Sequence, residues 1–184
     1  MKDRNRIIVL VVSLVLLIVI VKFGYDYLSG SYTPKESDST TIETKLAKDF
    51  TVYDEEGNTV KLSDFKGKKP VLINIWASWC GPCKAEMPYF EEAIKKYGDE
   101  VEILMVNLTD GQRETKEKAL KFLKDNNLEM DVVFDEDLNT ANAYNVRGIP
   151  RTIFINIDGE ITYDREGLID EDMLRNNIKK IISQ

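Results

Sequence analysis

The chain has 184 residues, which is enough for one ordinary domain with short appendages, and its 43% apolar and 31% charged residues are typical of a globular protein. Its formal net charge of −7 argues against a nucleic-acid partner, because binding to phosphates requires clustered lysines and arginines. The sequence contains no histidine and only two cysteines, Cys80 and Cys83, which are too few ligands for a zinc site. Covalent haem attachment requires a histidine where Lys84 follows the second cysteine. We therefore expect neither a metal nor another cofactor.

The first 28 residues have the pattern of a membrane anchor. Basic residues near the start precede an apolar run over residues 7–21, which continues less strictly to residue 28. As a helix, about 22 residues would extend roughly 33 Å, enough to cross a bilayer. The basic residues place the N-terminus in the cytoplasm. We therefore expect residues 1–28 to form a basic stub and a transmembrane signal-anchor. The protein would then be a single-pass protein of the cell membrane, with the rest of the chain on the extracytoplasmic side.

A cleaved signal peptide is the alternative interpretation of this segment, since it also has a basic start and an apolar centre. Small residues from Ser29 to Ser31 would permit cleavage, although no Ala-x-Ala site is present. Residues 29–47 are rich in serine, threonine and charge, and we expect them to form a flexible linker. The remaining residues, 48–184, are expected to form one domain.

Apolar patterns and turn signals in residues 48–184 predict strands in alternation with helices. Two short strands around Asp54–Asn58 have the pattern of a β-hairpin, and residues 71–76 form a nearly continuous apolar run, typical of a central strand covered on both faces. Asp158-Gly159 indicates a second hairpin. This order predicts an α/β fold with a mixed central sheet flanked by helices and with an N-terminal β-hairpin extension. The expected strands are residues 50–53, 59–62, 71–76, 101–107, 132–134, 152–157 and 161–163, and the expected helices are residues 80–97, 115–126, 138–144 and 170–182.

The two cysteines stand in the segment Cys80-Gly81-Pro82-Cys83, directly after the central strand and at the start of the helix expected over residues 80–97. Unpaired backbone N–H groups and the helix dipole favour an anion at a helix N-terminus, so Cys80 is expected to be the attacking thiolate. Cys83 follows about one turn later, where it can resolve a mixed disulfide. This placement favours a redox-active pair over an accidental or metal-binding Cys-x-x-Cys.

Several segments carry a resemblance to a known family. Residues 75–88, with the sequence Ile-Trp-Ala-Ser-Trp-Cys-Gly-Pro-Cys-Lys-Ala-Glu-Met-Pro, resemble the ResA/TlpA-like branch of the thioredoxin superfamily. Further matching segments are Asp54-Glu55-Glu56-Gly57, Leu62-Ser63-Asp64-Phe65-Lys66-Gly67, Gly148-Ile149-Pro150 and Ile157-Asp158-Gly159. The resemblance covers about residues 48–184 and implies a thioredoxin-like fold with an N-terminal membrane anchor.

The resemblance also implies roles for individual residues. Ile149-Pro150 matches the loop that carries a cis-proline opposite the cysteines, where the residue before the proline offers backbone groups to an extended substrate. Trp79, Ile149 and Pro150 are accordingly expected to bind substrate. Glu86, one helical turn after the second cysteine, matches an acid that tunes the pair, while Asn74 replaces the buried acid of cytoplasmic thioredoxin. A solvated Glu86 and an ordinary trans-proline at a strand start are the alternatives.

Members of this branch reduce disulfides outside the cell, commonly the haem-binding cysteines of apocytochrome c during cytochrome c biogenesis, and receive electrons from a transmembrane protein. The resemblance therefore implies an extracytoplasmic thiol-disulfide oxidoreductase. Its partners would be disulfide-containing protein substrates and a transmembrane electron donor. The Gly-Pro dipeptide between the cysteines is that of thioredoxin and favours a reductant.

Two alternative functions share this fold. A redoxin-type peroxidase requires a cysteine in a Pro-x-x-x-Thr-x-x-Cys setting, which neither cysteine has. A non-catalytic thioredoxin-like binding or chaperone module generally lacks one of the two cysteines, whereas both are present here.

Overall fold

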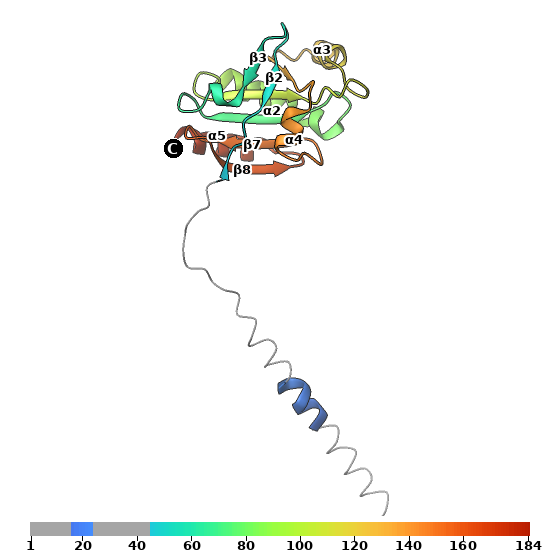
Figure 1. The fold of residues 1–184 in the computed structure, drawn as a ribbon, viewed down its shortest axis with the longest axis vertical. Coiled ribbons are helices and arrows are strands. Elements are labelled where there is room, and N and C mark those ends of the chain that lie inside the picture. The colour runs from blue at the N-terminus through green and yellow to red at the C-terminus, as the bar shows by residue number, and fades with distance from the viewer. Residues whose placement is uncertain (1–15, 24–44) are drawn as a thin grey trace, which may run out of the picture. The chain divides into compact units, whose positions relative to one another are not determined.

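The computed structural model of the protein describes residues 16–23 and 45–184 (Figure 1). The chain divides into two compact units, residues 1–42 and residues 43–184. Residues 16–23 form a helix whose side chains are exposed. Among the helices of the described residues, none combines the length and the apolar character needed to span a bilayer. The rest of the expected anchor and the expected linker up to residue 44 lie outside the described part of the chain.

One mixed sheet organises the folded unit (Figure 1). Its eight strands are β1 (Lys45–Leu46), β2 (Thr51–Tyr53), β3 (Thr59–Lys61), β4 (Val71–Trp76), β5 (Glu102–Asn107), β6 (Val133–Phe134), β7 (Arg151–Ile155) and β8 (Glu160–Glu166). The helices of this unit are η1 (Leu62–Asp64), α2 (Gly81–Tyr97), α3 (Lys116–Asp125), α4 (Asn139–Ala143) and α5 (Glu171–Ile182). The strand order is β1-β8-β7-β4-β5-β6-β2-β3, with β4 parallel to β5 and antiparallel to β7. The predicted α/β fold with a mixed sheet and flanking helices is confirmed.

Strand β4 lies at the centre of the core because both of its faces are covered. Its six residues, Val71 to Trp76, are all buried. Successive side chains of a strand point to opposite faces. Leu72 and Trp76 accordingly pack in the hydrophobic cluster with α2, α3 and α5, while Ile73 and Ile75 pack in the cluster on the other face. Burial on both faces explains why this segment is a nearly continuous apolar run, and each large aliphatic side chain contributes about 1.5–3 kcal/mol.

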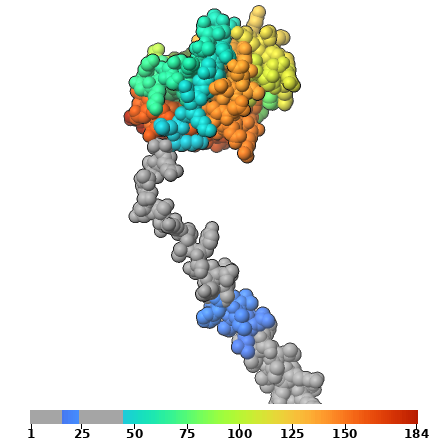
Figure 2. Space-filling model, viewed as in Figure 1, coloured from blue at the N-terminus to red at the C-terminus, as the bar shows by residue number. Residues whose placement is uncertain are grey.

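The N-terminal hairpin expected around Asp54–Asn58 is present and extends the sheet at one edge. β2 and β3 pair in antiparallel register, and β2 joins the sheet through Tyr53, which lies opposite Phe134 of β6. The hydroxyl of Tyr53 donates a hydrogen bond to Asp137 at 2.8 Å, in the segment that leads into α4. Figure 2 shows these two parts of the chain side by side on one face of the unit, the hairpin in cyan and the α4 segment in orange.

Two strands at the opposite edge of the sheet differ from the expectation. The sequence places residues 45–47 in the linker, whereas Lys45–Leu46 form β1 against β8. Strand β8 continues to Glu166 instead of ending at residue 163. Hydrogen bonds between side chains stabilise the additional residues of β8, since Arg151 of β7 donates to the Asp164 carboxylate at 2.9 and 2.8 Å. Neither stretch shows an apolar pattern, because both lie at a half-exposed edge of the sheet.

We expect residues 43–184 to fold without the residues that precede them, because the buried core lies within this unit. Thermal unfolding followed by circular dichroism should be one cooperative transition. Its midpoint should lie within about 3 °C of that of the full-length chain, a difference of less than about 1 kcal/mol.

A chain that begins at residue 48 is the matched control. It lacks β1 and the hydrogen bond from the Ala47 N–H to the Gly159 carbonyl, so it should unfold at a lower temperature. If residues 43–184 prove insoluble or unfolded, this domain boundary is wrong.

Candidate active site

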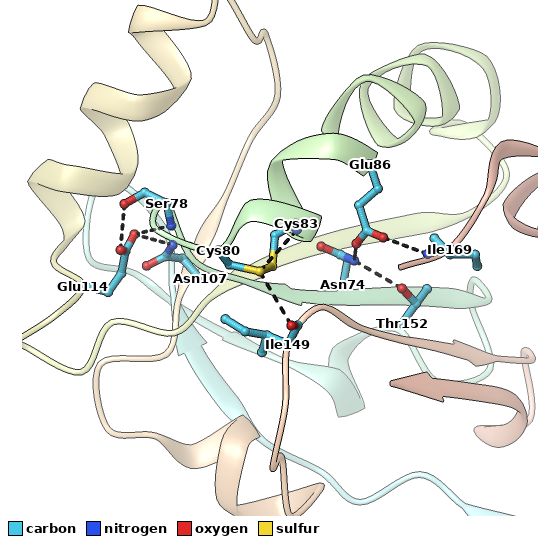
Figure 3. Close-up of a disulfide and its surroundings, with 10 residues drawn as sticks. All are labelled: Asn74, Ser78, Cys80, Cys83, Glu86, Asn107, Glu114, Ile149, Thr152 and Ile169. Carbon is cyan, nitrogen blue, oxygen red and sulfur yellow. Dashed lines mark hydrogen bonds between the residues drawn. A yellow bond between two sulfur atoms is a disulfide. The ribbon is translucent and has the colours of Figure 1, made fainter. Parts of the chain in front are cut away.

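Cys80 and Cys83 lie where the central strand leads into the following helix (Figure 3). After β4 ends at Trp76, the loop Ala77–Trp79 leads to Cys80, which is the N-cap residue of α2. The two cysteines form a disulfide, with Cα atoms 5.3 Å apart. The backbone N–H of Cys83 donates to the Cys80 sulfur at 3.2 Å, so this sulfur takes the place of the oxygen that caps other helices. The pair therefore lies at a helix N-terminus, as the sequence predicts, where an anion is stabilised.

The two cysteines differ in their access to the surface. Cys80 is 4% exposed and follows Trp79, which is 38% exposed, whereas Cys83 is completely buried. Cys80 thus keeps a small exposed surface next to the exposed Trp79, whereas Cys83 has none. This asymmetry agrees with the expected roles of an attacking and a resolving thiol.

The loop that precedes β7 lies opposite the cysteines. The Ile149–Pro150 peptide bond is cis, as the resemblance implies. The carbonyl oxygen of Ile149 lies 3.6 Å from the Cys80 sulfur (Figure 3). The carbonyl oxygen of Pro150 accepts a hydrogen bond from the Gly167 N–H at 2.8 Å, which ties the loop to the end of β8. The structure thus places the loop that is expected to bind substrate against Cys80, the more exposed of the two cysteines.

Glu86 is completely buried one helical turn after Cys83, so the solvated alternative for this residue is wrong. Its carboxylate accepts hydrogen bonds from the Asn74 side chain at 2.8 Å and from the Ile169 N–H at 3.0 Å (Figure 3). Burial raises the pKa of Glu86 from 4.5 to about 7, although these hydrogen bonds and the charge of Arg165 act in the opposite direction. Glu86 therefore changes its protonation state near neutral pH.

Asn74 connects Glu86 to the sheet beneath the helix. Its side-chain nitrogen donates to Glu86 and, at 3.2 Å, to the hydroxyl oxygen of Thr152. Its side-chain oxygen has no hydrogen-bond partner among the described residues. A buried acceptor without a donor costs about 1–3 kcal/mol. Rotation of the amide by half a turn would direct this oxygen at a protonated Glu86, so Asn74 can serve both protonation states of the acid.

A second buried carboxylate, Glu114, is absent from the sequence expectation and holds the loop in front of the cysteines. It accepts hydrogen bonds from the Ser78 N–H at 3.0 Å, the Ser78 hydroxyl at 2.8 Å and the Asn107 side chain at 3.0 Å (Figure 3). These hydrogen bonds fix the loop that leads to Cys80. One signal in the sequence points to this contact: Asn107 ends β5 opposite Trp76, the last residue of β4, so the loop after β5 begins beside the loop that carries the cysteines.

Comparison with known proteins gives the family. A model described as the AhpC/TSA family matches residues 44–164. Thiol-disulfide oxidoreductase ResA of Bacillus subtilis (strain 168) is 33% identical over 182 residues, which cover 98% of this chain and 96% of the relative. The chain belongs to the AhpC/TSA family. It is a homologue of ResA and a thiol-disulfide oxidoreductase with Cys80 and Cys83 as its cysteine pair.

Solved structures of related proteins share the fold of this oxidoreductase. The exposed lipoprotein thioredoxin Etrx1 from Streptococcus pneumoniae strain TIGR4 is 29% identical, with a TM-score of 0.63, and the match covers 72% of this chain and 99% of that chain. StoA from Bacillus subtilis is 26% identical, with a TM-score of 0.61, and the match covers 72% and 97% of the two chains. The thioredoxin-like fold expected from the resemblance is thereby confirmed.

The oxidoreductase lacks the cysteine setting of a redoxin-type peroxidase. A Pro-x-x-x-Thr-x-x-Cys motif that ends at Cys80 would require proline and threonine where Ile73 and Ala77 stand. For Cys83 the same two positions are occupied by Trp76 and by the first cysteine. The pair therefore matches the chemistry of disulfide exchange and not that motif.

We expect Glu86 to make the oxidised protein less stable as the pH rises. Its pKa is about 7 in the folded protein against an ordinary 4.5, so the folded state holds this proton more tightly than the unfolded chain. The stability that Glu86 contributes is fully present below the ordinary pKa and is lost as the pH rises through about 7. Between about pH 5 and pH 8, the free energy of unfolding in guanidinium should fall by on the order of 3 kcal/mol more in the wild type than in Glu86→Gln.

Glu100→Gln, which changes an exposed carboxylate, is the control and should retain the pH dependence of the wild type. Equal pH dependence in wild type and Glu86→Gln would show that the proton is not held at Glu86.

We expect Glu114→Ala to loosen the loop that carries Trp79. The variant leaves the Ser78 N–H and the Asn107 amide without their acceptor, which should lower the free energy of unfolding by about 2–4 kcal/mol. Because Trp76 is buried, quenching of tryptophan fluorescence by acrylamide reports on Trp79 and should increase. Ser78→Ala loses only the hydroxyl contact and should cost about 1 kcal/mol. Wild-type quenching in Glu114→Ala would contradict this role.

Proposed function

We propose that this thiol-disulfide oxidoreductase is a membrane-anchored, extracytoplasmic reductase of protein disulfides. The observation that carries the proposal is the arrangement of the pair. Cys80 is the more accessible cysteine, caps α2 and lies against the Ile149 carbonyl, while Cys83 is buried behind it. The Gly-Pro dipeptide between them favours reduction of a partner over its oxidation.

The first chemical step joins the partner to Cys80. In the reduced protein, the Cys80 thiolate attacks one sulfur of the partner's disulfide. A bond between these two sulfurs forms, the partner's own S–S bond breaks, and its other sulfur leaves as a thiolate that takes up a proton. The N–H groups at the start of α2 stabilise the attacking thiolate, and that of Cys83 already points at it.

The second step releases the partner. Cys83 loses its proton and attacks the Cys80 sulfur, the bond between Cys80 and the partner breaks, and the partner leaves as a dithiol after taking up a second proton. Two electrons pass from the protein to the partner, and the Cys80–Cys83 disulfide remains. We assign the proton of Cys83 to Glu86, one turn along α2, because a pKa of about 7 suits a proton acceptor near neutral pH.

We assign substrate binding to Trp79, Ile149 and Pro150. An extended peptide can donate an N–H to the Ile149 carbonyl, in the manner of a short added strand. Trp79 offers exposed aromatic surface directly before Cys80. The Gly167 N–H supports this geometry, because its hydrogen bond to Pro150 fixes the loop.

The N-terminal segment and the relatives support the proposed location. The apolar run over residues 7–28 supports an anchor in the cell membrane. The relative Etrx1 is described as an exposed lipoprotein, which supports a catalytic domain on the extracytoplasmic side. We propose that the haem-binding cysteines of apocytochrome c are among the substrates. Each turnover leaves a disulfide that must be reduced again, and we assign this step to a transmembrane electron donor.

We expect Cys83→Ala to accumulate mixed disulfides, because Cys83 is the thiol that displaces a bound partner. The reduced full-length variant, mixed with insulin, should give adducts on non-reducing gels. Dithiothreitol should reduce these adducts, and Cys80→Ala should give none.

Iodoacetamide at neutral pH should modify Cys80 before Cys83 in the reduced wild type, as measured by mass spectrometry. Faster labelling of Cys83 would overturn the assignment of roles.

Insulin reduction with dithiothreitol as the electron donor tests the function itself. Wild type should accelerate the reaction strongly, and a variant that lacks both cysteines should not. No acceleration by the wild type would favour the non-catalytic binding module, whereas rapid turnover of hydrogen peroxide would favour the peroxidase.

A further inference from the structure

The loop after β5 holds an arginine against the tryptophan of the active site. The central guanidinium carbon of Arg113 lies 3.4 Å from the centroid of the Trp79 ring, a close stacking contact. Arg113 is exposed, and no carboxylate among residues 45–184 forms an ion pair with it. A stacked guanidinium keeps its N–H edge free, and this edge matches a carboxylate through two parallel hydrogen bonds. Arg113 is therefore a cation without an anion, beside the residue that precedes Cys80.

Contacts on both sides of Arg113 fix its loop. The Asp110 carboxylate accepts hydrogen bonds from the Gln112 N–H at 2.8 Å and from the Glu114 N–H at 2.9 Å. The Glu114 side chain in turn binds the N–H and the hydroxyl of Ser78. Arg113 and Glu114 thus contact the two residues that precede Cys80, since Arg113 stacks on Trp79 and Glu114 binds Ser78. A cation held in this way needs little further ordering when it binds an anion, which favours binding.

We propose that Arg113 determines specificity by favouring substrates that carry a carboxylate close to the disulfide presented to Cys80. This inference rests on the proposed function, in which Trp79 contacts the substrate. The net charge of the chain is −7, so an acidic partner is repelled on average, and Arg113 supplies a local attraction where the partner must dock.

The other side of the site, at the Ile149–Pro150 loop, carries charges of both signs, because Arg147 is exposed there and Glu166 lies close by. The Glu166 carboxylate is packed against Gly148, next to the Ile149–Pro150 loop, because a Cβ at Gly148 would lie only 2.6 Å from one of its oxygens. The proposal places the acidic group of a substrate on the Trp79 side of the disulfide, where Arg113 lies against the ring. Arg165 is turned to the protein instead, since its Nε donates to the Leu168 carbonyl.

A packing role is the alternative for Arg113, because a guanidinium on an indole ring also restricts that ring. The two roles differ in what they predict. Loss of packing alone would slow every substrate alike, whereas loss of the charge would change the ratio between acidic and basic substrates.

Single-turnover kinetics with three synthetic peptides test the proposal. The peptides share one Cys-x-x-Cys disulfide and differ only in the flanking residues, which are Glu, Gln or Lys. Reduced full-length protein transfers two electrons to the peptide, and acid quenching with alkylation measures the second-order rate constant. At low ionic strength, the wild type should reduce the Glu peptide about three- to tenfold faster than the Lys peptide, and salt should diminish this ratio.

Variants of Arg113 assign the ratio to this side chain. Arg113→Gln should bring the ratio close to one, Arg113→Glu should invert it, and Arg113→Lys should retain part of it. Lys179→Gln removes the same charge from the exposed last turn of α5 and should retain the wild-type ratio. The Gln peptide is the uncharged reference, and the rate constants of the Glu and Lys peptides are expressed relative to it for each protein.

The outcomes separate this inference from the proposed function. A wild type that reduces all three peptides at equal rates would overturn the role of Arg113 and leave the reductase intact. An equal loss of rate on all peptides in Arg113→Gln would also overturn it, in favour of packing. A wild type that reduces none of the peptides would overturn the proposed function together with the inference.

Discussion

The unpaired N–H groups at the start of α2 are the constraint on which the rest of the site depends. The first turn of a helix has donors that no residue of the helix accepts, and here the sulfur of Cys80 receives one of them. This arrangement works only if the sulfur is held at the helix start with one side open. Strand β4 provides the fixed support, because it is buried on both faces and paired with β5 on one side and β7 on the other. The loop Ala77–Trp79 then has little freedom in where it delivers the cysteine.

Two buried glutamates lie near the cysteine pair, Glu86 on α2 and Glu114 on the loop after β5. They differ in the number of hydrogen bonds that they accept. Glu114 receives three hydrogen bonds, two from Ser78 and one from Asn107, and these contacts fix a loop. Glu86 receives two, from Asn74 and Ile169. Burial outweighs these two bonds and raises the pKa of Glu86 to about 7. Glu114 thus anchors a loop through its contacts, while Glu86 connects α2 to Asn74 of β4 and to Ile169.

The sequence predicts the parts of the fold whose signal is local. The apolar run of residues 71–76 predicts a strand that is covered on both faces, and all six residues are buried. Gly98 predicts the end of the helix, and α2 does end at Tyr97 with Gly98 as its C-cap. The placement of Cys80 at the helix start follows from the same two patterns. Glu86 could be associated with the cysteines because one helical turn is a fixed distance along the chain.

The parts that the sequence does not reveal depend on pairing between distant segments. Strand β1 has two residues and exists only because β8 offers it an edge, so no window of sequence contains its signal. Glu114 reaches Ser78 across 36 positions of the chain, and its burial follows from how two loops meet at the carboxyl ends of β4 and β5. The contact between Arg113 and Trp79 likewise forms only because these two loops lie side by side. Local patterns therefore locate the chemistry, while the groups that orient and tune it come from the tertiary structure.

One short segment beyond the range that the family model matches connects the Ile149–Pro150 loop with the buried acid. The family match ends at residue 164, whereas the Gly167 N–H binds the Pro150 carbonyl and the Ile169 N–H binds the Glu86 carboxylate. These two contacts lie two residues apart on the same backbone. Any displacement of the segment would act both on the loop that lies against Cys80 and on the donor that favours the ionised form of Glu86. One piece of chain therefore contributes both to the proton affinity of the acid and to the position of the Ile149–Pro150 loop, and the cysteine motif by itself does not contain it.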